Sequence, residues 1–158
     1  MNKVFLIISI VFLGISISCD TSFPTPVSFE DQLAIDLELI DEFLSENEIV
    51  AEKHESSIRF LLTEEGTGDN PRGTDDVKVK YTASLLNGQV VDSSEDGVTF
   101  QLSRLILAWQ IMIPTMNEGG KMTIYAPSVY SYGNQGQGQI PPNANIIFDI
   151  ELVEIVGN

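Results

Sequence analysis

The sequence is poor in the residues that carry most reactive chemistry. Among its 158 residues there are one cysteine, one histidine and one tryptophan. A single cysteine excludes an intramolecular disulfide. The lone histidine, His54, lies among Glu52, Lys53 and Glu55 and is interpreted as a solvated residue. With no cluster of metal-ligating residues and no serine nucleophile motif, we expect neither a metal site nor a cofactor.

Positive charge is scarce as well. Eight Lys and Arg residues stand against 23 Asp and Glu residues, for a formal net charge of −15. Nucleic-acid binding needs a stripe of Lys or Arg against the phosphate backbone, so this class of function is excluded. The acidic residues concentrate before residue 77, and the segment after it is almost balanced. The length and the 43% hydrophobic content indicate one folded domain of ordinary size.

Long apolar runs are absent except at the N-terminus. Lys3 precedes an apolar run from Val4 to Ile15 that only Ser9 and Gly14 interrupt. The run is shorter than the roughly 20 residues that a transmembrane helix needs. A short positive region followed by such a run is typical of an export signal. We therefore predict a signal peptide over residues 1–18.

Cys19 follows this run directly. A small residue, Ser18, just before a lone cysteine resembles a bacterial lipobox, although Ser16 stands where leucine is usual. The resemblance implies that Cys19 is the lipid attachment site and that residues 19–27 form a lipidated tether. The protein is then expected in the bacterial cell envelope, anchored to a membrane on its periplasmic side or at the cell surface. A plain secretory signal with an incidental cysteine is the alternative.

Residues 28–56 are expected to form an acidic amphipathic helix and a connector. Ser28 followed by Asp31 resembles a capping box. Apolar residues then recur every three or four positions as far as about Glu46. They are Phe29, Leu33, Leu37, Ile40 and Leu44, with Ile35, Leu39 and Phe43 broadening the stripe. Either the following domain or a second copy of the chain is expected to cover this stripe.

From Ser57 onward the apolar period changes to two, which predicts strands. Asn87-Gly88 predicts a tight hairpin, because both residues tolerate positive φ. One short helix is expected over about Leu105 to Met112, ended or kinked by Pro114. Strands with one short central helix indicate an α+β fold over residues 57–158, in which a curved antiparallel sheet wraps around that helix.

Four separated blocks of this region resemble the FKBP family of peptidyl-prolyl cis-trans isomerases. They are Val79–Ala83 with Leu86–Ser94, Phe100–Ser103 with Leu105–Trp109, Ala126–Gly133, and Ile140–Leu152. All four occur in the family's order. Residues 57–158 are therefore identified as an FKBP-like domain, with the curved sheet and short helix of that fold.

The resemblance implies catalysis without a covalent intermediate. Rotation about an amide bond meets a barrier of about 18–20 kcal/mol, because resonance is lost midway. For Xaa–Pro bonds the uncatalysed exchange takes roughly tens to hundreds of seconds. An apolar pocket with aromatic walls suits the twisted amide better than water does. The implied function is an isomerase that assists the folding of exported, proline-containing polypeptides, and a macrolide ligand is a further expectation from the family.

The same resemblance assigns the site. The catalytic residues are expected to be Tyr81, Asp92, Ile106, Trp109, Tyr132 and Phe148. The substrate pocket adds Val91, Val98, Leu105 and Ile140. Trp109 would form the floor, with Tyr81 and Phe148 as walls. The Ile106 N–H and the Tyr132 hydroxyl would bind substrate carbonyls, and Asp92 would be a carboxylate at the buried edge of the pocket.

Departures from the family pattern concern activity more than fold. Val91 stands where the family usually has phenylalanine, a loss of roughly 1–2 kcal/mol of contact with substrate. Family glycines are replaced at four positions, and residues 133–139 are glycine-rich, which indicates either a mobile flap or a disordered loop. The replacements are Ala83, Ser103, Ala108 and Met112. They favour one alternative, an FKBP-like binding or chaperone module with little or no isomerase turnover.

Overall fold

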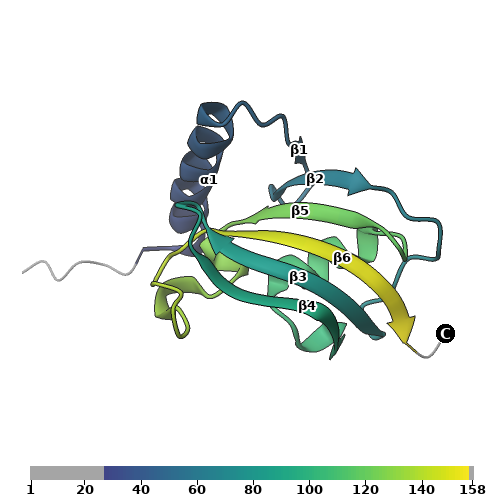
Figure 1. The fold of residues 1–158 in the computed structure, drawn as a ribbon. Helices are drawn as coiled ribbons and strands as arrows, with labels where there is room; N and C mark the ends of the chain where they lie inside the picture. The colour runs from purple at the N-terminus through teal and green to yellow at the C-terminus, as the bar shows by residue number, and fades with distance from the viewer. Residues whose placement is uncertain (1–26, 157–158) are drawn as a thin grey trace, which may run out of the picture.

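A single antiparallel sheet dominates the computed structural model, which describes residues 27–156 (Figure 1). Its strand order is β1-β2-β5-β6-β3-β4, and all neighbouring strands are antiparallel. The strands are β1 (Glu52–Lys53), β2 (Arg59–Glu64), β3 (Asp76–Leu85), β4 (Val90–Gln101), β5 (Lys121–Ala126) and β6 (Ile146–Val156). The predicted sheet is thus confirmed. It begins before residue 57, because β1 lies in the segment expected to be a connector.

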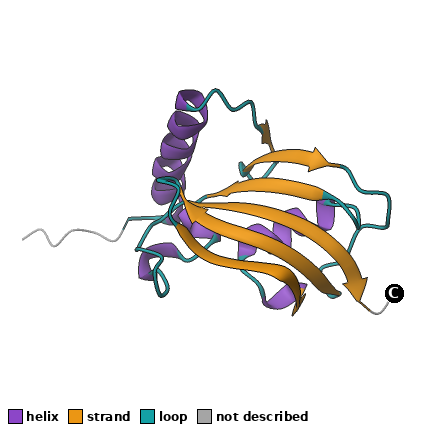
Figure 2. Cartoon of the chain, viewed as in Figure 1, coloured by secondary structure: helices purple, strands orange, loops and turns teal. Residues whose placement is uncertain are grey.

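The sheet curves around the short helix α2 (Leu107–Met112), as Figure 2 shows. Ala108, Trp109 and Met112 are buried on this helix and pack against the inward-facing side chains of the sheet. Those side chains alternate along β3 and β6, as period two requires. The α-helix stops at Met112, and Pro114 lies in the 3-10 turn η2 (Ile113–Thr115) that follows. The predicted helix and its end are therefore confirmed, although it begins at Leu107.

The turn between β3 and β4 is tight, but it differs from the two-residue turn that Asn87-Gly88 predicts. Only Gly88 has a positive φ, of 84°. Its N–H donates to the carbonyl of Leu85 at 2.9 Å, and the Leu85 N–H donates to the Gln89 carbonyl at 2.9 Å. The Asn87 side chain accepts a bond from the Gln89 N–H at 3.0 Å instead of adopting positive φ. The turn is thus a longer hairpin loop with its glycine at the positive-φ position.

A bulge interrupts the pairing of β3 with the edge strand β4. Val79 pairs with Val98, whereas Tyr81 pairs with Ser94. The segment Glu95-Asp96-Gly97 therefore lies opposite Lys80 alone, and Gly97 has a φ of 81°. Such a bulge bends the strand and changes the direction of its side chains.

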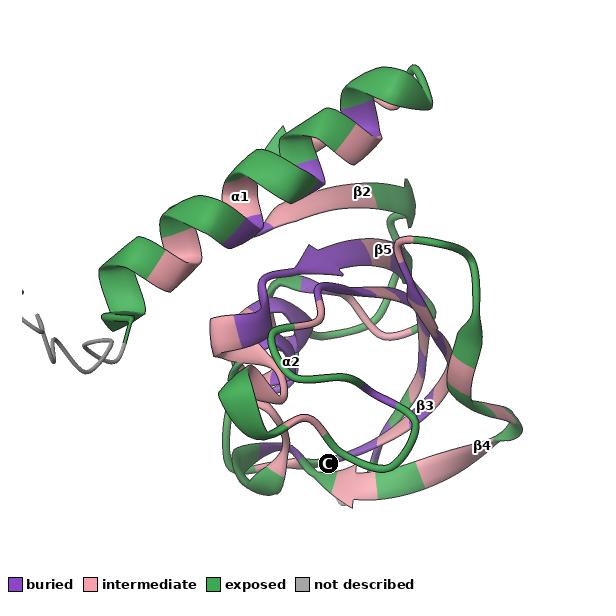
Figure 3. Cartoon of the chain, turned by 90° about the vertical axis from the view of Figure 1, so that its left-hand side faces the viewer, coloured by how far each residue is buried: buried purple, intermediate pink, exposed green. Residues whose placement is uncertain are grey.

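Helix α1 (Phe29–Glu46) lies across the outer face of the sheet, over β2 and β5 (Figure 3). The Ser28 side chain accepts a bond from the Asp31 N–H at 3.1 Å, so the predicted cap is confirmed. Ile40 and Leu44 pack against Tyr125 of β5. An ion pair of 2.7 Å between Asp41 and Arg59 of β2 adds a second attachment.

Only part of the apolar stripe of α1 is covered by the sheet. Ile35 and Leu39 stay 46% and 45% exposed, and neither is among the residues that pack with Ile40, Leu44 and Tyr125. Neither α1 nor any other helix within residues 27–156 combines the length and the apolar character needed to cross a bilayer. The predicted signal peptide and Cys19 lie outside the described residues.

Candidate active site

Trp109 lies at the centre of an aromatic cluster built from four separate elements. Its ring centroid is 5.1 Å from that of Tyr81 in β3, 5.5 Å from Phe148 in β6 and 6.2 Å from Phe100 in β4. All three contacts are edge-to-face, the arrangement that aromatic quadrupoles favour. Trp109 and Phe148 are 4% and 1% exposed, so the centre of the cluster is part of the core of the domain.

The indole of Trp109 carries an unsatisfied donor. Its Nε1 is buried and has no hydrogen-bond partner among the described residues. Native structures hold few such groups, since a buried unpaired donor costs about 1–3 kcal/mol. The aromatic cluster therefore contains a polar group that the described part of the chain leaves free.

Tyr81 and Asp92 form the polar margin of the cluster. The Tyr81 hydroxyl donates to Asp92 Oδ2 at 2.6 Å, and Asp92 Oδ1 accepts from the Ser93 N–H at 2.9 Å. Burial, followed by this hydrogen bond and the negative charge of Asp92, raises the pKa of Tyr81 well above its usual value. Asp92 itself is exposed, because β4 is an edge strand. The expectation of a carboxylate at a buried edge is thus corrected to an exposed one.

Tyr132 reaches the cluster from the loop between β5 and β6, here called the flap loop (residues 127–145). Its half-buried ring packs against the core between the 3-10 turns η3 (Ser128–Tyr130) and η4 (Gly133–Gln135). Burial, and then the charge of Asp92, raises the pKa of Tyr132. Ile140 is buried in the same core, and its backbone exchanges two hydrogen bonds with Gln137 at 2.8 and 3.0 Å.

Ile106 is the residue that immediately precedes α2. Its carbonyl accepts from the Trp109 and Gln110 N–H groups at 3.0 and 3.1 Å. Its own N–H has no partner among the backbone hydrogen bonds of residues 27–156. Leu105, beside it, packs against the core. Within residues 27–156, the backbone N–H of Ile106 is thus left without a backbone acceptor.

The two predicted valines of β4 differ in position. Val91 is half-buried and packs against the core, whereas Val98 pairs with Val79 and is not among the side chains packed against the core cluster. Sequence reasoning missed Phe100, whose ring lies 6.5 Å from that of Tyr81 as well as against Trp109. The signal was present, since Phe100 opens one of the blocks that resemble the family.

The glycine-rich part of the flap loop forms tight turns. Gly136 has a φ of 62°, and a Cβ at this position would lie 2.3 Å from the Ile140 carbonyl oxygen. Glycine is therefore required here by backbone conformation and by close approach. Gly138 also has a positive φ, of 58°, but a Cβ there would meet nothing within 4 Å.

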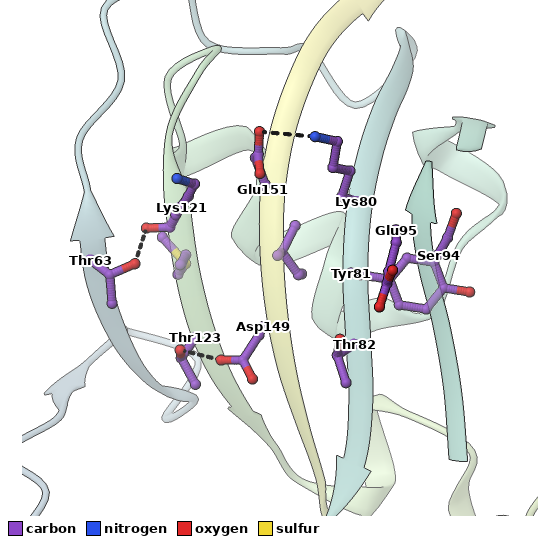
Figure 4. Close-up of a pocket in the computed structure, with 12 residues that line it drawn as sticks. Thr63, Lys80, Tyr81, Thr82, Ser94, Glu95, Lys121, Thr123, Asp149 and Glu151 are labelled. Atoms are coloured by element: carbon purple, nitrogen blue, oxygen red, sulfur yellow. Dashed lines mark hydrogen bonds and ion pairs between the residues drawn. The ribbon is translucent and has the colours of Figure 1, made fainter. Parts of the chain in front are cut away.

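A separate groove of about 330 Å³ crosses the outer face of the sheet, on the side opposite α2 (Figure 4). Lys80 and Glu151 form an ion pair of 3.7 Å there, and Thr123 donates to Asp149 at 2.6 Å. Tyr81, Met122 and Ile150 also line this groove, so it borders the Trp109 cluster at Tyr81. Residues 27–156 contain no group of three or more His, Cys, Asp or Glu side chains that could hold a metal ion.

Several proteins are similar in sequence to this chain. The chain is 40% identical over 104 residues to the FKBP-type peptidyl-prolyl cis-trans isomerase FkpA of Aeromonas hydrophila, covering 64% of this chain and 39% of that protein. It is 38% identical over 113 residues to FK506-binding protein 1 of Kluyveromyces lactis, covering 67% of this chain and 99% of that protein. The chain thus spans about two fifths of the length of the FkpA relatives that it matches.

Solved structures give the same fold. A peptidyl-prolyl cis-trans isomerase from Pseudomonas syringae superposes with a TM-score of 0.68 at 26% identity, covering 83% of this chain and 98% of that one. FkpA from Escherichia coli gives a TM-score of 0.69 at 28% identity, covering 80% and 60%. The model of the FKBP-type peptidyl-prolyl cis-trans isomerase domain matches residues 68–153, and the chain therefore belongs to that family.

Proposed function

We propose that this protein is a peptidyl-prolyl cis-trans isomerase whose site is the Trp109 cluster. The observation that carries the proposal is the enclosure of one buried indole by the rings of Tyr81, Phe100 and Phe148 in a chain of this family. A proline ring is small and apolar. It matches an aromatic floor and walls far better than it matches the polar groove on the outer face.

The chemistry asked of these residues is the stabilisation of a twisted amide. Rotation costs about 18–20 kcal/mol in water, and the twisted state has lost the charge separation of the planar amide. An apolar cluster therefore favours the transition state over the ground state, which is the requirement for catalysis. The free N–H of Ile106 and the hydroxyl of Tyr132 hold the flanking carbonyls, so that the two parts of the chain rotate about one bond.

The Tyr81 hydroxyl is committed to Asp92, so it orients the wall of the site. Because the pKa of Tyr81 is raised above 10.0, the hydroxyl stays protonated into the alkaline range and the bond to Asp92 persists there. Val91 and Ile140 complete the apolar boundary on opposite sides. Proline-containing polypeptides are the substrates that such a site accepts, and macrolides that mimic a twisted prolyl amide are a second ligand class.

The location that we propose is the bacterial cell envelope. The apolar run before Cys19 supports export, and Ser18-Cys19 supports lipid attachment that anchors the protein to a membrane. Exported polypeptides with slow Xaa–Pro bonds are then the clients. These residues lie outside the described part of the chain, so the support comes from the sequence.

Exchange of Xaa–Pro peptides followed by NMR tests the proposed activity. The purified protein should accelerate cis-to-trans exchange, and Tyr132→Phe should lower kcat/KM roughly three- to tenfold, the value of one lost hydrogen bond. Thr123→Val, on the outer face, is the matched control and should leave the rate unchanged. A folded protein that binds the peptides without accelerating exchange would establish the binding-module alternative instead.

A further inference from the structure

The three buried polar residues of the described chain form one network beneath the flap loop. Asp36 and Ser128 are 0% exposed, and Asn145 is 5% exposed. The Ser128 hydroxyl donates to Asp36 Oδ2 at 2.7 Å, and the Val129 N–H donates to the same oxygen at 3.3 Å. Gln32, one turn earlier on α1, donates to Asp36 Oδ1 at 2.9 Å. Both carboxylate oxygens of a fully buried residue are therefore engaged.

Asn145 closes the network from the other end of the loop. Its Oδ1 accepts from the Ser128 N–H at 3.0 Å, and its Nδ2 donates to the Asp36 carbonyl at 3.2 Å. Ser128 follows the end of β5 closely, and Asn145 immediately precedes β6. The Asp36 side chain thus binds the first end of the flap loop to α1, and Asn145 joins the second end to Ser128 and to the Asp36 backbone.

The other attachments of the loop are the packing of Tyr130, Tyr132 and Ile140 against the core and a hydrogen bond of 3.2 Å from the Tyr130 hydroxyl to the Ser56 carbonyl. Between β5 and β6 it contains no strand, only the isolated bridge between Gln137 and Ile140. A second link to α1 is the edge-to-face contact of Phe29 with Tyr130, at 5.7 Å. Tyr132 lies two residues beyond this contact. Its position therefore depends on how firmly the first turn of the loop is held, as well as on the packing of its own ring against the core.

We infer that Asp36 is a positioning residue for the isomerase site, which holds the flap loop and through it the Tyr132 hydroxyl. The catalytic part of this inference rests on the proposed function, and the part about the loop does not. Asp36 lies outside residues 68–153, so α1 supplies to the site a support that the family domain itself does not contain. A buried carboxylate would be costly if it only attached the helix, since apolar packing serves that purpose better.

Hydrogen exchange and kinetics together test the inference. Asp36→Leu removes both acceptors and replaces them with a larger apolar side chain, and Asp36→Asn keeps the volume and one oxygen toward Ser128. We expect amide exchange within residues 128–140 to become at least tenfold faster in Asp36→Leu, with the amides of β3 and β6 unchanged. The value of kcat/KM should fall roughly three- to tenfold, and Asp36→Asn should recover most of both losses.

A double mutant separates positioning from general loosening. If Asp36 acts through Tyr132, Asp36→Leu should lower kcat/KM no further in a Tyr132→Phe background. Additive losses in the double mutant would overturn the inference. Asp41→Leu is the matched control, because Asp41 lies on the same helix but bonds Arg59 and not the loop. Equal loosening of the loop by Asp41→Leu would also overturn it.

A milder variant, Ser128→Ala, tests the same network. If Asp36→Leu fails to fold, Ser128→Ala removes a single bond of the network and should speed exchange within residues 128–140 about threefold. Unchanged exchange in Ser128→Ala would overturn the inference. A wild-type protein without isomerase activity would refute the proposed function, while the exchange measurements would still decide whether Asp36 holds the loop.

Discussion

Val91 stands where the family pattern has phenylalanine, and this difference bears on turnover. Val91 is half-buried and packs against the core that contains Trp109. We expect Val91→Phe to supply a missing aromatic wall and to raise kcat/KM roughly three- to thirtyfold, the equivalent of about 1–2 kcal/mol of contact. Peptide exchange measured beside the melting temperature tests this prediction.

The melting temperature is needed because a larger ring can overpack the site, at a cost of about 1–3 kcal/mol. A variant with wild-type stability and an unchanged rate would show that Val91 does not limit catalysis. A faster and equally stable variant would establish that the ring at this position contacts the substrate.

The raised pKa of Tyr81 predicts a specific effect of alkaline pH on stability. An unfolded tyrosine loses its proton near pH 10.0, whereas folded Tyr81, buried and bonded to Asp92, keeps its proton to higher pH. The unfolded state is therefore favoured progressively as the pH rises above 10. Tyr81→Phe should show a shallower loss of stability in this range, measured as the free energy of unfolding at pH 9 to 11. Equal slopes for the two proteins would contradict the assignment.

Two residues show what a sequence pattern leaves out at this scale. Asp36 follows no apolar period, and its burial is set by Ser128 and Asn145, which lie about 90 and 110 positions along the chain. Phe100 contacts Trp109 because it pairs with the buried Val77 of β3 and so shares the inward face of the sheet. Both placements depend on pairing between distant segments, which periodicity alone does not reveal.

At the scale of elements, the glycines of the flap loop allow a paired test of turn geometry. Gly136→Ala places a Cβ against the Ile140 carbonyl, whereas Gly138→Ala has an equally unfavourable φ in open space. Gly138→Ala should cost roughly 1 kcal/mol of stability, and Gly136→Ala clearly more. Denaturant unfolding of both variants measures the difference. Equal costs would mean that the loop relaxes away from the contact.

Elements with strong local signals could be predicted almost to the residue. The Ser28 cap and the apolar stripe fixed the start and end of α1, and Pro114 marked the end of α2. The hairpin at Asn87-Gly88 was located correctly, although only Gly88 adopts the positive φ that both residues tolerate. The side chain of Asn87 can satisfy the Gln89 N–H from an ordinary conformation, and the sequence does not reveal which solution the backbone takes.

For the whole molecule, the order of the four blocks predicted the family and the sheet around α2. The place of α1 could not be predicted, because its stripe is wide enough to fit either the domain or a second chain. One side of the apolar stripe of α1 is covered by Tyr125, Leu61 and Ile147. Their outward orientation is recognisable only once the strand order is known.

The proposed lipid anchor at Cys19 leads to a prediction that can be tested in cells. Metabolic labelling with a fatty-acid analogue should mark the wild-type protein and leave Cys19→Ala unlabelled, because the thiol of Cys19 is the proposed attachment point. The Ser18→Ala variant, which keeps a small residue before the cysteine, is the control and should be labelled normally. Equal labelling of wild type and Cys19→Ala, or none of either, would leave only the plain secretory signal.

The two edges of the sheet affect whether a proposed client, an unfolded chain, could pair with the sheet as an extra strand. An unfolded client exposes strands that seek a partner edge, and a long flat edge would recruit them into aggregates. Here one edge is β1, only two residues long. The other is β4, which bulges at Gly97 and carries Glu95 and Asp96 at the break. Both edges are therefore poor templates for strand addition. An extended client would not be retained on the protein as an added strand.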